Sequence, residues 1–381
     1  MDIVVHRKIE NLEKIVPKWK TLIEEFREIT VFQEINWIKN WWMYKSQKSK
    51  ITPYIIEIKE QDRTIGIIPL YIEKKFIFRI LKPIGSEQSD YLLPILSKDY
   101  LPNVLLELAF DKIYENKSDW DYLHWCDIPE DSYFVNFFNE RFKHKDLLVK
   151  KKSIVCPYIK LCGDIEETKR KISKTFLKEI LKKEKKLKGQ GDLKYHKVIL
   201  ESKIEPILNI LFNQHYERWK NTNTPSKYVD EKERENLVQV AKCLFRNDLL
   251  KLNYLSLNDE VIGVDFGISD GKRNYLYLHS IDMNYRKYSP GNILTYKIIL
   301  DACKEGNEIV DFLRGDEEYK KKWGTIDKYN LKYIFFNNTF KSRVFKKGYH
   351  VSNNNYYFKD LARRVLTNSV FGLNLSFLGM I

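Results

Sequence analysis

Residues 273–304 contain an expected strand, a loop and a helix in this order, and this arrangement limits the possible folds more than any other part of the chain. Residues 273–279 (RNYLYLH) alternate in the way a β-strand does. Ser289 is a favoured N-cap, and Pro290 suits the first helical position because the N–H that it lacks would have no acceptor there. A helix from Pro290 to about Lys304 would direct its first amides at the loop, where its positive end attracts phosphate oxygens. We therefore expect this loop to bind a phosphorylated ligand.

The size and charge of the chain limit its class and its partners. With 381 residues, 43% of them hydrophobic and 14% aromatic, the chain has enough apolar material for two folded domains. Its formal net charge is +14, which favours nucleic acid, an anionic membrane face or phosphorylated small molecules as partners. Charge by itself does not choose among these three.

The cysteines and the apolar runs indicate a compartment. The five cysteines are scattered, without a CxxC pair or a histidine at metal-ligand spacing, so we expect a reducing environment and no bound metal. The first residues have no apolar core of signal-peptide length, and nowhere is an apolar run long enough to span a bilayer. We expect a soluble, cytoplasmic protein with no membrane span.

Two similar β-hairpins suggest that the chain is a degenerate duplication. Residues 54–58 and 65–72 flank one polar turn, and residues 251–257 and 261–268 flank another. In both hairpins the second strand carries Ile-Gly shortly after an acidic turn. Each half would then contain helices, a hairpin and further strands.

Three other segments complete the expected organisation. Residues 11–48 are expected to be helical, with tryptophans packing in the core. Residues 168–188 have apolar positions near helical spacing and a lysine-rich outer face, which is either solvated or a wall against a nucleotide or nucleic acid. We predict an N-terminal acceptor-side domain over residues 1–165, a cofactor-binding domain over residues 166–345, and a tail over residues 346–381 that packs on the domains.

The order of elements after the expected phosphate loop is specific. A short strand at 309–313 follows the helix, then a turn, a short helix at 316–323 and a strand at 329–336. This order, with the motif Tyr-Arg-x-x-Ser-x-Gly-x-x-Leu, resembles the acyl-CoA segment of GNAT acyltransferases, whose usual form is Arg or Gln, two residues, Gly, any residue, then Gly or Ala. Arg286, Ser289 and Gly291 occupy those places. Ser289 stands where the family usually has its first glycine, and we expect it to take an N-cap conformation without left-handed dihedrals.

Further motifs resemble the CelD-like branch of that superfamily. These are the Ser-Pro-Gly form of the loop, Asp-Phe through Arg-Gly to Tyr-Lys-x-x-Trp at 311–323, His-x-x-x-Trp at 215–219, the tryptophan-rich segment around residue 41, and the loop at 85–91. The resemblance implies an α/β fold with mixed sheets, in which two tandem GNAT-like domains enclose an inter-domain cleft as in Fem-type transferases. It also implies that acyl-CoA binds the second half through Arg286, Lys287, Tyr288, Ser289, Gly291, Asn292, Lys320 and Lys321.

The resemblance also implies the chemistry that the cleft must perform. A neutral amine must attack the thioester, the oxyanion must meet a donor, and the CoA thiolate must be protonated. We assign Tyr319 to protonate the thiolate, with aromatic packing beside Trp323 as the alternative. Asp90 is the leading candidate base, with orienting the amine or capping a turn as its alternatives, and His215 is second because imidazole titrates near neutral pH. Asp311 and Arg314 are expected to form an ion pair within their loop.

The predicted function is that of an acyl-CoA-dependent N-acyltransferase acting by direct attack. The acceptor would be a small phosphorylated amine, best matched by a nucleotide-linked amino sugar of cell-surface polysaccharide biosynthesis. One alternative is a Fem-type aminoacyl-tRNA-dependent transferase, which the basic segment 168–188 favours; the intact loop at 286–291 speaks against tRNA and against nucleic acid as a partner. The other is a noncatalytic polysaccharide-assembly factor. No Ser-His-Asp order, HExxH or Walker motif is present in the sequence.

Overall fold

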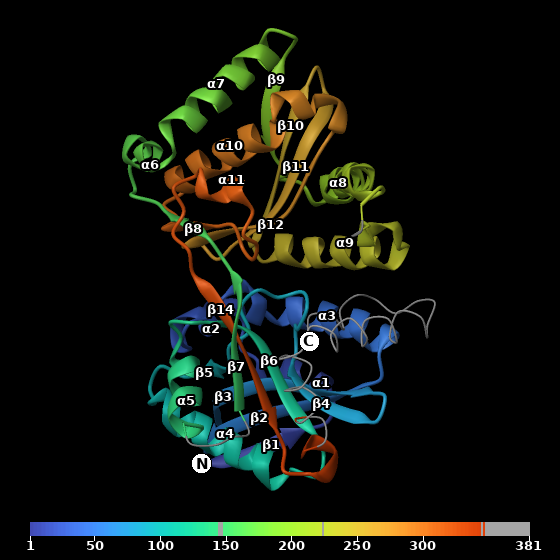
Figure 1. Ribbon diagram of the computed structural model, residues 1–381, viewed down its shortest axis with the longest axis vertical. Coiled ribbons are helices and arrows are strands. Elements are labelled where there is room, and N and C mark those ends of the chain that lie inside the picture. Colours follow the sequence, from blue (N-terminus) through green and yellow to red (C-terminus); the bar gives the residue numbers. More distant parts are fainter. Residues whose placement is uncertain (144–147, 223–224, 344–345, 347–381) are drawn as a thin grey trace.

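The computed structural model of the protein describes residues 1–143, 148–222, 225–343 and 346, and these residues form two lobes, each built on one β-sheet (Figure 1). The predicted tail at 346–381 lies outside the described residues apart from Lys346, so its packing stays a prediction. Within the described part of the chain, no helix combines the length and the apolar character needed to cross a membrane.

The sheet of the first lobe is covered by helices on both faces. Its strand order is β1-β2-β3-β4-β6-β14-β7, with β5 paired to β3: β1 (Asp2–His6), β2 (Ile51–Glu60), β3 (Arg63–Lys75), β4 (Phe78–Pro83), β5 (Ile95–Leu96), β6 (Tyr122–Pro129), β7 (Leu148–Val155) and β14 (Tyr329–Phe336). One face packs against α4 (Pro102–Glu115) and α5 (Tyr133–Arg141). The other face packs against α1 (Glu10–Ile15), α2 (Trp19–Glu25) and α3 (Ile35–Lys48).

The sheet of the second lobe is likewise enclosed between two helical layers. Its order is β8-β13-β12-β11-β10-β9: β8 (Tyr158–Lys160), β13 (Ile309–Asp311), β12 (Arg273–Ile281), β11 (Glu260–Ser269), β10 (Leu250–Leu257) and β9 (Leu193–Lys197). α6 (Ile165–Lys171), α7 (Lys174–Lys188) and α10 (Pro290–Lys304) share one apolar core with the sheet. α8 (Ile204–Trp219) and α9 (Glu231–Arg246) share another, and α11 (Glu318–Lys321) follows β13.

The two sheets have the same sequence of strand directions, which supports the duplication. In each, four antiparallel strands are followed by a helix, α4 or α10, and by a fifth strand that pairs parallel to the fourth. A sixth strand then pairs antiparallel to the fifth, and it comes from outside the repeat in both cases. The first sheet takes β14, which follows the second repeat along the chain, and the second sheet takes β8, which precedes it.

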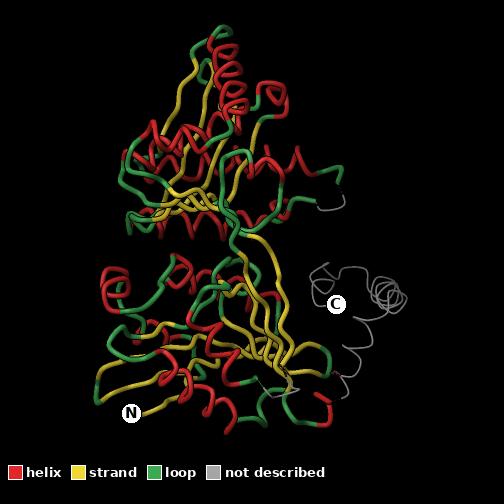
Figure 2. Tube along the Cα trace, turned by 60° about the vertical axis from the view of Figure 1, so that its left-hand side comes forward, coloured by secondary structure: helices red, strands yellow, loops and turns green. Residues whose placement is uncertain are grey.

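This strand exchange means that the sheets do not divide the chain at residues 165 and 166, where the sequence placed the domain boundary. β14 falls in the expected second domain but pairs with β6 and β7, and β8 falls in the expected first domain but pairs with β13. Composition shifts along the chain carry no information about such long-range pairing. Figures 1 and 2 show the crossing segments as the connection between the two lobes.

The local predictions can be compared element by element. Both hairpins are confirmed as β2/β3 and β10/β11, and the helix at 290–304 is confirmed at both ends. The helical segment expected over 11–48 is divided among α1, α2 and α3. The chain is extended at Val16, because a residue that precedes proline avoids the helical region, and again at Phe26. The segment 168–188 is likewise split, between α6 and α7, at the extended Ile172.

Candidate active site

A cavity opens where β12 and β13 separate. The two strands pair in parallel only over Arg273–Tyr275 and Ile309–Asp311, whereas β12 continues to Ile281. Beyond Tyr275, no described strand pairs with that edge of β12. A cavity of about 590 Å³ lies there, lined from the first lobe by Gln88 and Asp90 and from the second by residues of β12, α8, α10 and the loop into α11. Asp90, His215, Tyr319, Gly291, Asn292 and Lys320, six of the predicted site residues, lie on its wall.

The start of α10 forms one end of this cavity. Ser289, the N-cap, has φ 51° and ψ 54°, so the expectation that a serine here avoids left-handed dihedrals was wrong. Its amide donates to Arg286 O at the end of the 3-10 helix η4 (Met283–Tyr288), and its carbonyl accepts from Asn292 N, so one residue must join two helical segments. The Ser289 hydroxyl does not cap α10; it accepts from Lys183 Nζ at 2.8 Å.

Gly291 allows the first turn of α10 to lie directly against β12. A Cβ on this residue would lie 2.6 Å from His279 Nε2 and 3.3 Å from Ile281 Cγ2. Because real Cβ atoms do not approach other atoms so closely, only glycine fits without a shift of its neighbours. Because residue 291 has no side chain, the first turn of α10 can lie against His279 and Ile281 of β12.

The basic residues predicted for the phosphates lie outside the cavity, around the outer side of the same helix end. Arg286 and Lys287 are exposed on η4, and the Tyr288 hydroxyl accepts a hydrogen bond from Gln190 Nε2. Lys183 of α7 reaches Ser289 from the other side. The basic helix α7 thus lies beside the loop, with Phe176 and Ile180 on its buried face.

The two lysines of α11 differ in their surroundings. Lys320 is buried, and its ammonium donates to Arg314 O at 3.0 Å and to the carbonyls of Leu313 and Gly315 at 3.4 Å, with Glu317 Oε2 2.9 Å away. These contacts occupy the ammonium group and tie the loop between β13 and α11. Lys321 is exposed and does not line the cavity.

Tyr319, the predicted proton donor, lines the cavity. It lies on the cavity wall with 43% of its surface exposed, and burial of the phenol, with a smaller effect of Glu317, raises its pKa to about 12. The phenol is therefore protonated at neutral pH. Trp323, which was the alternative packing partner, is buried against the rings of Phe176 and Phe312.

Asp90 is engaged by Arg314 of the opposite lobe. Arg314 Nε lies 2.5 Å from Asp90 Oδ1, and the Arg314 amide donates to Asp90 Oδ2 at 3.1 Å. The same guanidinium has Nη1 3.6 Å from Asp127 Oδ1, and its Nη2 donates to Glu87 O at 3.2 Å. One carboxylate oxygen is thus held by the guanidinium and the other by the backbone amide of Arg314, and this geometry suits an orienting group.

The expected ion pair between Asp311 and Arg314 does not form; both residues bind elsewhere. Asp311 accepts from the Tyr91 hydroxyl at 2.8 Å, and Arg273 Nη1 lies 3.6 Å from its carboxylate. Arg314 points to Asp90 and Asp127 instead. Asp311 therefore binds Tyr91, and Arg314 binds Asp90 and Asp127. These partners belong to the first lobe and become neighbours only when the two lobes pack together.

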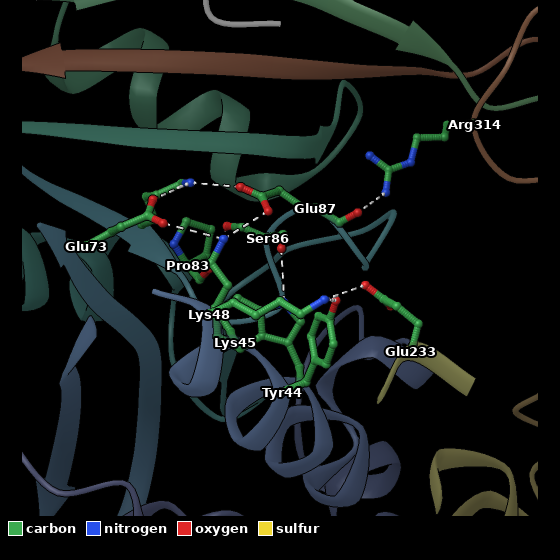
Figure 3. A network of polar contacts seen from close by, with 11 residues as sticks. Tyr44, Lys45, Lys48, Glu73, Pro83, Ser86, Glu87, Glu233 and Arg314 are labelled. Atoms are coloured by element: carbon green, nitrogen blue, oxygen red, sulfur yellow. Dashed lines mark hydrogen bonds and ion pairs between the residues drawn. The ribbon is translucent and has the colours of Figure 1, made fainter. Parts of the chain in front are cut away.

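Tryptophans of α3 hold the loop that carries Asp90. Trp37 Nε1 donates to Ser89 Oγ and Trp41 Nε1 to Ser86 O, each at 3.0 Å. Both rings are buried, as predicted, so they pack in the core and position the loop at once. Figure 3 shows the other side of this loop, where Glu87 meets Lys45 at 3.0 Å and Glu87 O faces Arg314.

Two histidines line the cavity. His215 Nδ1 lies 2.8 Å from Ser226 Oγ, and burial, with Arg218 and Lys227 nearby, lowers the pKa of His215 to about 4. His279 was not identified from the sequence; its Nδ1 lies 3.3 Å from Oδ1 of the buried Asp265, directly across the β11/β12 pair. The signal that marks this pair is an aspartate inside an otherwise apolar strand at 261–268.

Among the described residues, no cluster of three or more His, Cys, Asp or Glu is arranged to hold a metal ion.

Comparisons with known proteins agree with this geometry. Residues 174–321 match the family model described as "Acetyltransferase (GNAT) domain". The chain is similar to a solved structure described as "Crystal structure of FemX", with 10% identity, a TM-score of 0.60, and coverage of 91% of this chain and 100% of that chain. A conserved protein of unknown function from Bacteroides thetaiotaomicron has 10% identity, a TM-score of 0.57, and coverage of 88% and 100%. L-PGS from Bacillus licheniformis has 9% identity, a TM-score of 0.50, and coverage of 91% and 98%.

At these identities the structural likeness shows the fold. It confirms the predicted α/β architecture of two domains with mixed sheets. No curated protein matches this chain.

Proposed function

We propose that this protein, an acyltransferase whose residues 174–321 match a GNAT domain, transfers an acyl group from acyl-CoA to the amine of a small anionic acceptor. The observation that carries the proposal is the cavity between the separated strands β12 and β13, with the start of α10 at one end and residues of the first lobe facing it. Direct attack of the amine on the thioester requires both substrates to meet in this cavity.

The open edge of β12 suits the pantetheine arm of CoA. That arm carries two amides, and a strand edge presents unpaired N–H and C=O groups to such a chain. The diphosphate would then lie at the first turn of α10, near Ser289, Gly291 and Asn292, because a helix N-terminus stabilises an anion. Arg286 and Lys287 would contribute charge from the outer side of the same loop.

The acceptor would enter at the end of the cavity where the two lobes meet. Arg218 and Lys227 lie on this wall as exposed cations, and Trp219 beside them offers a ring for stacking. Such a set suits an acceptor with a phosphate and a planar base, and we propose a nucleotide-linked amino sugar of cell-surface polysaccharide biosynthesis. The five free cysteines fit a reducing compartment, so we propose that the reaction takes place in the cytoplasm.

Two residues of the cavity wall have proposed roles in the transfer. Tyr319, protonated at neutral pH, would donate its proton to the CoA sulfur as the C–S bond breaks. Asp90, bound to Arg314, would orient the acceptor side of the cavity rather than remove a proton. The exposed position of Lys321 and the carbonyl contacts of Lys320 leave both lysines outside the proposed phosphate site.

Calorimetric titration tests the cofactor first. Wild-type protein should bind acetyl-CoA, and turnover with a panel of nucleotide-linked amino sugars should exceed turnover with the corresponding free amino sugars. Tyr319→Phe should retain the Kd for acetyl-CoA while kcat falls by roughly 10²-fold, the usual scale for one proton-transfer group. Absence of acetyl-CoA binding at millimolar concentration would exclude this function.

A second function, aminoacyl transfer from charged tRNA, is favoured by one observation. α7 presents a lysine-rich face beside the loop, and Lys183 contacts Ser289 directly. An RNA backbone crossing α7 would bind with a steep salt dependence. Filter binding of charged tRNA at two salt concentrations distinguishes the two functions, since a CoA-dependent enzyme should bind tRNA weakly and without preference for the aminoacylated form.

A further inference from the structure

The cavity contains a histidine–carboxylate pair that the proposed roles above do not use. His279 on β12 and Asp265 on β11 are paired across the two strands, with Nδ1 3.3 Å from Oδ1. Asp265 is 1% exposed, whereas the His279 side chain is 28% exposed and lines the cavity. Among the described residues, Asp265 Oδ2 has no hydrogen-bond partner. The carboxylate therefore has one evident polar contact, which is the imidazole.

The arrangement determines which ring nitrogen faces the cavity. A carboxylate oxygen near Nδ1 favours the tautomer with the proton on Nδ1, which leaves the lone pair on Nε2. Nε2 lies toward Gly291 at the start of α10, at the wall where Asn292 and Tyr319 also lie. The ring is thus oriented from behind by a buried carboxylate, with Nε2 beside the first turn of α10 and the side chain partly exposed.

The second histidine of the cavity lacks such support. His215 Nδ1 contacts a serine hydroxyl, and burial together with Arg218 and Lys227 keeps its pKa near 4. An imidazole with so low a pKa is a poor proton acceptor. The charged and titratable groups that line the cavity with His279 come from both lobes: Asp265 on β11, Tyr277 on β12, His215 and Arg218 on α8, Lys227 and Tyr228 of the 3-10 helix at 227–229, Arg314 and Glu317 of the loop after β13, Tyr319 and Lys320 on α11, and Asp90 of the first lobe.

We propose that His279 is the general base of the transfer and that Asp265 is its positioning residue. This inference rests on the proposed acyl transfer to an amine. The amine nitrogen forms a bond to the thioester carbonyl carbon and gives a proton to His279 Nε2. The C–S bond then breaks, and the CoA sulfur takes a proton from Tyr319. Return of the His279 proton to the Tyr319 phenolate, directly or through water, restores both groups, so that one proton moves in total from the amine to the thiol.

The pH profile of kcat/KM separates this role from a structural one. Wild-type enzyme should show an acidic limb in this profile, and His279→Gln should lose that limb together with at least 10²-fold in kcat. Asp265→Asn removes the carboxylate that orients the ring, so kcat should fall while the Kd for acetyl-CoA stays at its wild-type value. His196→Gln is the matched control, because His196 stacks on Tyr254 outside the cavity.

Two further measurements keep the outcomes distinct. Acetyl-CoA titration of His279→Gln should give the wild-type Kd, and added imidazole should restore part of the activity of His279→Ala. If wild-type enzyme turns over but His279→Gln keeps the acidic limb and most of its kcat, or if His215→Gln alone removes the limb, the inference is wrong while the proposed function stands. If the wild-type protein neither binds acetyl-CoA nor acylates an amine, the proposed function fails and the inference with it.

Discussion

Arg314 Nε lies 2.5 Å from Oδ1 of Asp90, although the two residues come from different lobes. The same side chain also faces Asp127 and the carbonyl of Glu87, so the loop after β13 is held by three groups of the first lobe. This contact closes one side of the cavity. It therefore links the loop that carries Asp90, on the proposed acceptor side, to the loop after β13 in the lobe that is proposed to bind the cofactor.

Replacing Arg314 with lysine should weaken this connection while keeping the charge. Lysine lacks the planar fork, so the two carboxylates lose donors, and we expect the free energy of unfolding in urea to fall by roughly 3 kcal/mol. Arg246→Lys is the control, because Arg246 forms an exposed pair with Glu201 and its replacement should leave the free energy of unfolding nearly unchanged. Equal losses in the two variants would contradict a stabilising role for the inter-lobe contact.

The buried Asp127 should make stability depend on pH. Burial raises the pKa of Asp127 from 3.8 to about 6, with Arg314 opposing the shift. The folded state therefore holds this proton more tightly than the unfolded state, and the contribution of Asp127 to the unfolding free energy is lost as pH rises from about 4 to about 6. Urea unfolding across this range should show a smaller loss in Asp127→Asn than in the wild type, and asparagine also tolerates the φ of 58°. Asp62→Asn, in an exposed turn, should follow the wild type.

Gly291→Ala should impair cofactor binding more than stability. The added Cβ would meet His279 Nε2 at 2.6 Å, and the imidazole can rotate away, so we expect a stability loss within about 1 kcal/mol. The displaced ring should block the cavity wall and weaken acetyl-CoA binding by roughly tenfold, which corresponds to about 1.4 kcal/mol. Gly263→Ala in β11 is the control, since its Cβ would meet its nearest neighbour at 3.5 Å. Wild-type affinity in Gly291→Ala would show that this close approach is not part of the binding site.

Ser289→Gly should stabilise the protein slightly. Ser289 has a left-handed conformation, which costs an ordinary residue about 1 kcal/mol and glycine almost nothing. The loss of the hydrogen bond from Lys183 opposes this gain, so we expect a net change between zero and about +1 kcal/mol in thermal unfolding, with acetyl-CoA affinity retained. Ser289→Val, which cannot adopt these dihedrals easily, should reduce both. A large loss in Ser289→Gly would show that the hydroxyl itself is needed.

Lys320→Met should act on stability and not on phosphate binding. Its ammonium donates to three carbonyls of the loop before α11, and buried carbonyls without a donor cost about 1–3 kcal/mol. We expect a lower melting temperature, with the salt dependence of acetyl-CoA binding unchanged. Lys321→Met, at an exposed position, should leave stability within about 0.5 kcal/mol. A selective loss of CoA affinity in Lys320→Met would restore the role first predicted for this lysine.

The sequence by itself determined the elements whose signals are local. Pro290 and Ser289 mark the start of α10, and the turns at 60–63 and 258–260 mark the two hairpins, because capping and turn preferences depend on a few neighbouring residues. The motif at 286–291 also placed the candidate phosphate loop next to the strand that lines the cavity. The helical segment expected over 11–48 is interrupted, first at Val16, which is extended because Pro17 follows it, and then at Phe26.

The tertiary structure alone decided which lobe each strand joins and which side chains meet. β14 pairs with β6 across some 200 residues of chain, and Asp90 meets Arg314 at a separation of 224 residues. Asp265 and His279 became a pair because two strands align in one register, and a shift by one residue would place their side chains on opposite faces. Such contacts depend on packing and burial over the whole chain. A local sequence pattern can therefore indicate that a residue lies in the cavity, but it does not predict which distant residue that side chain contacts.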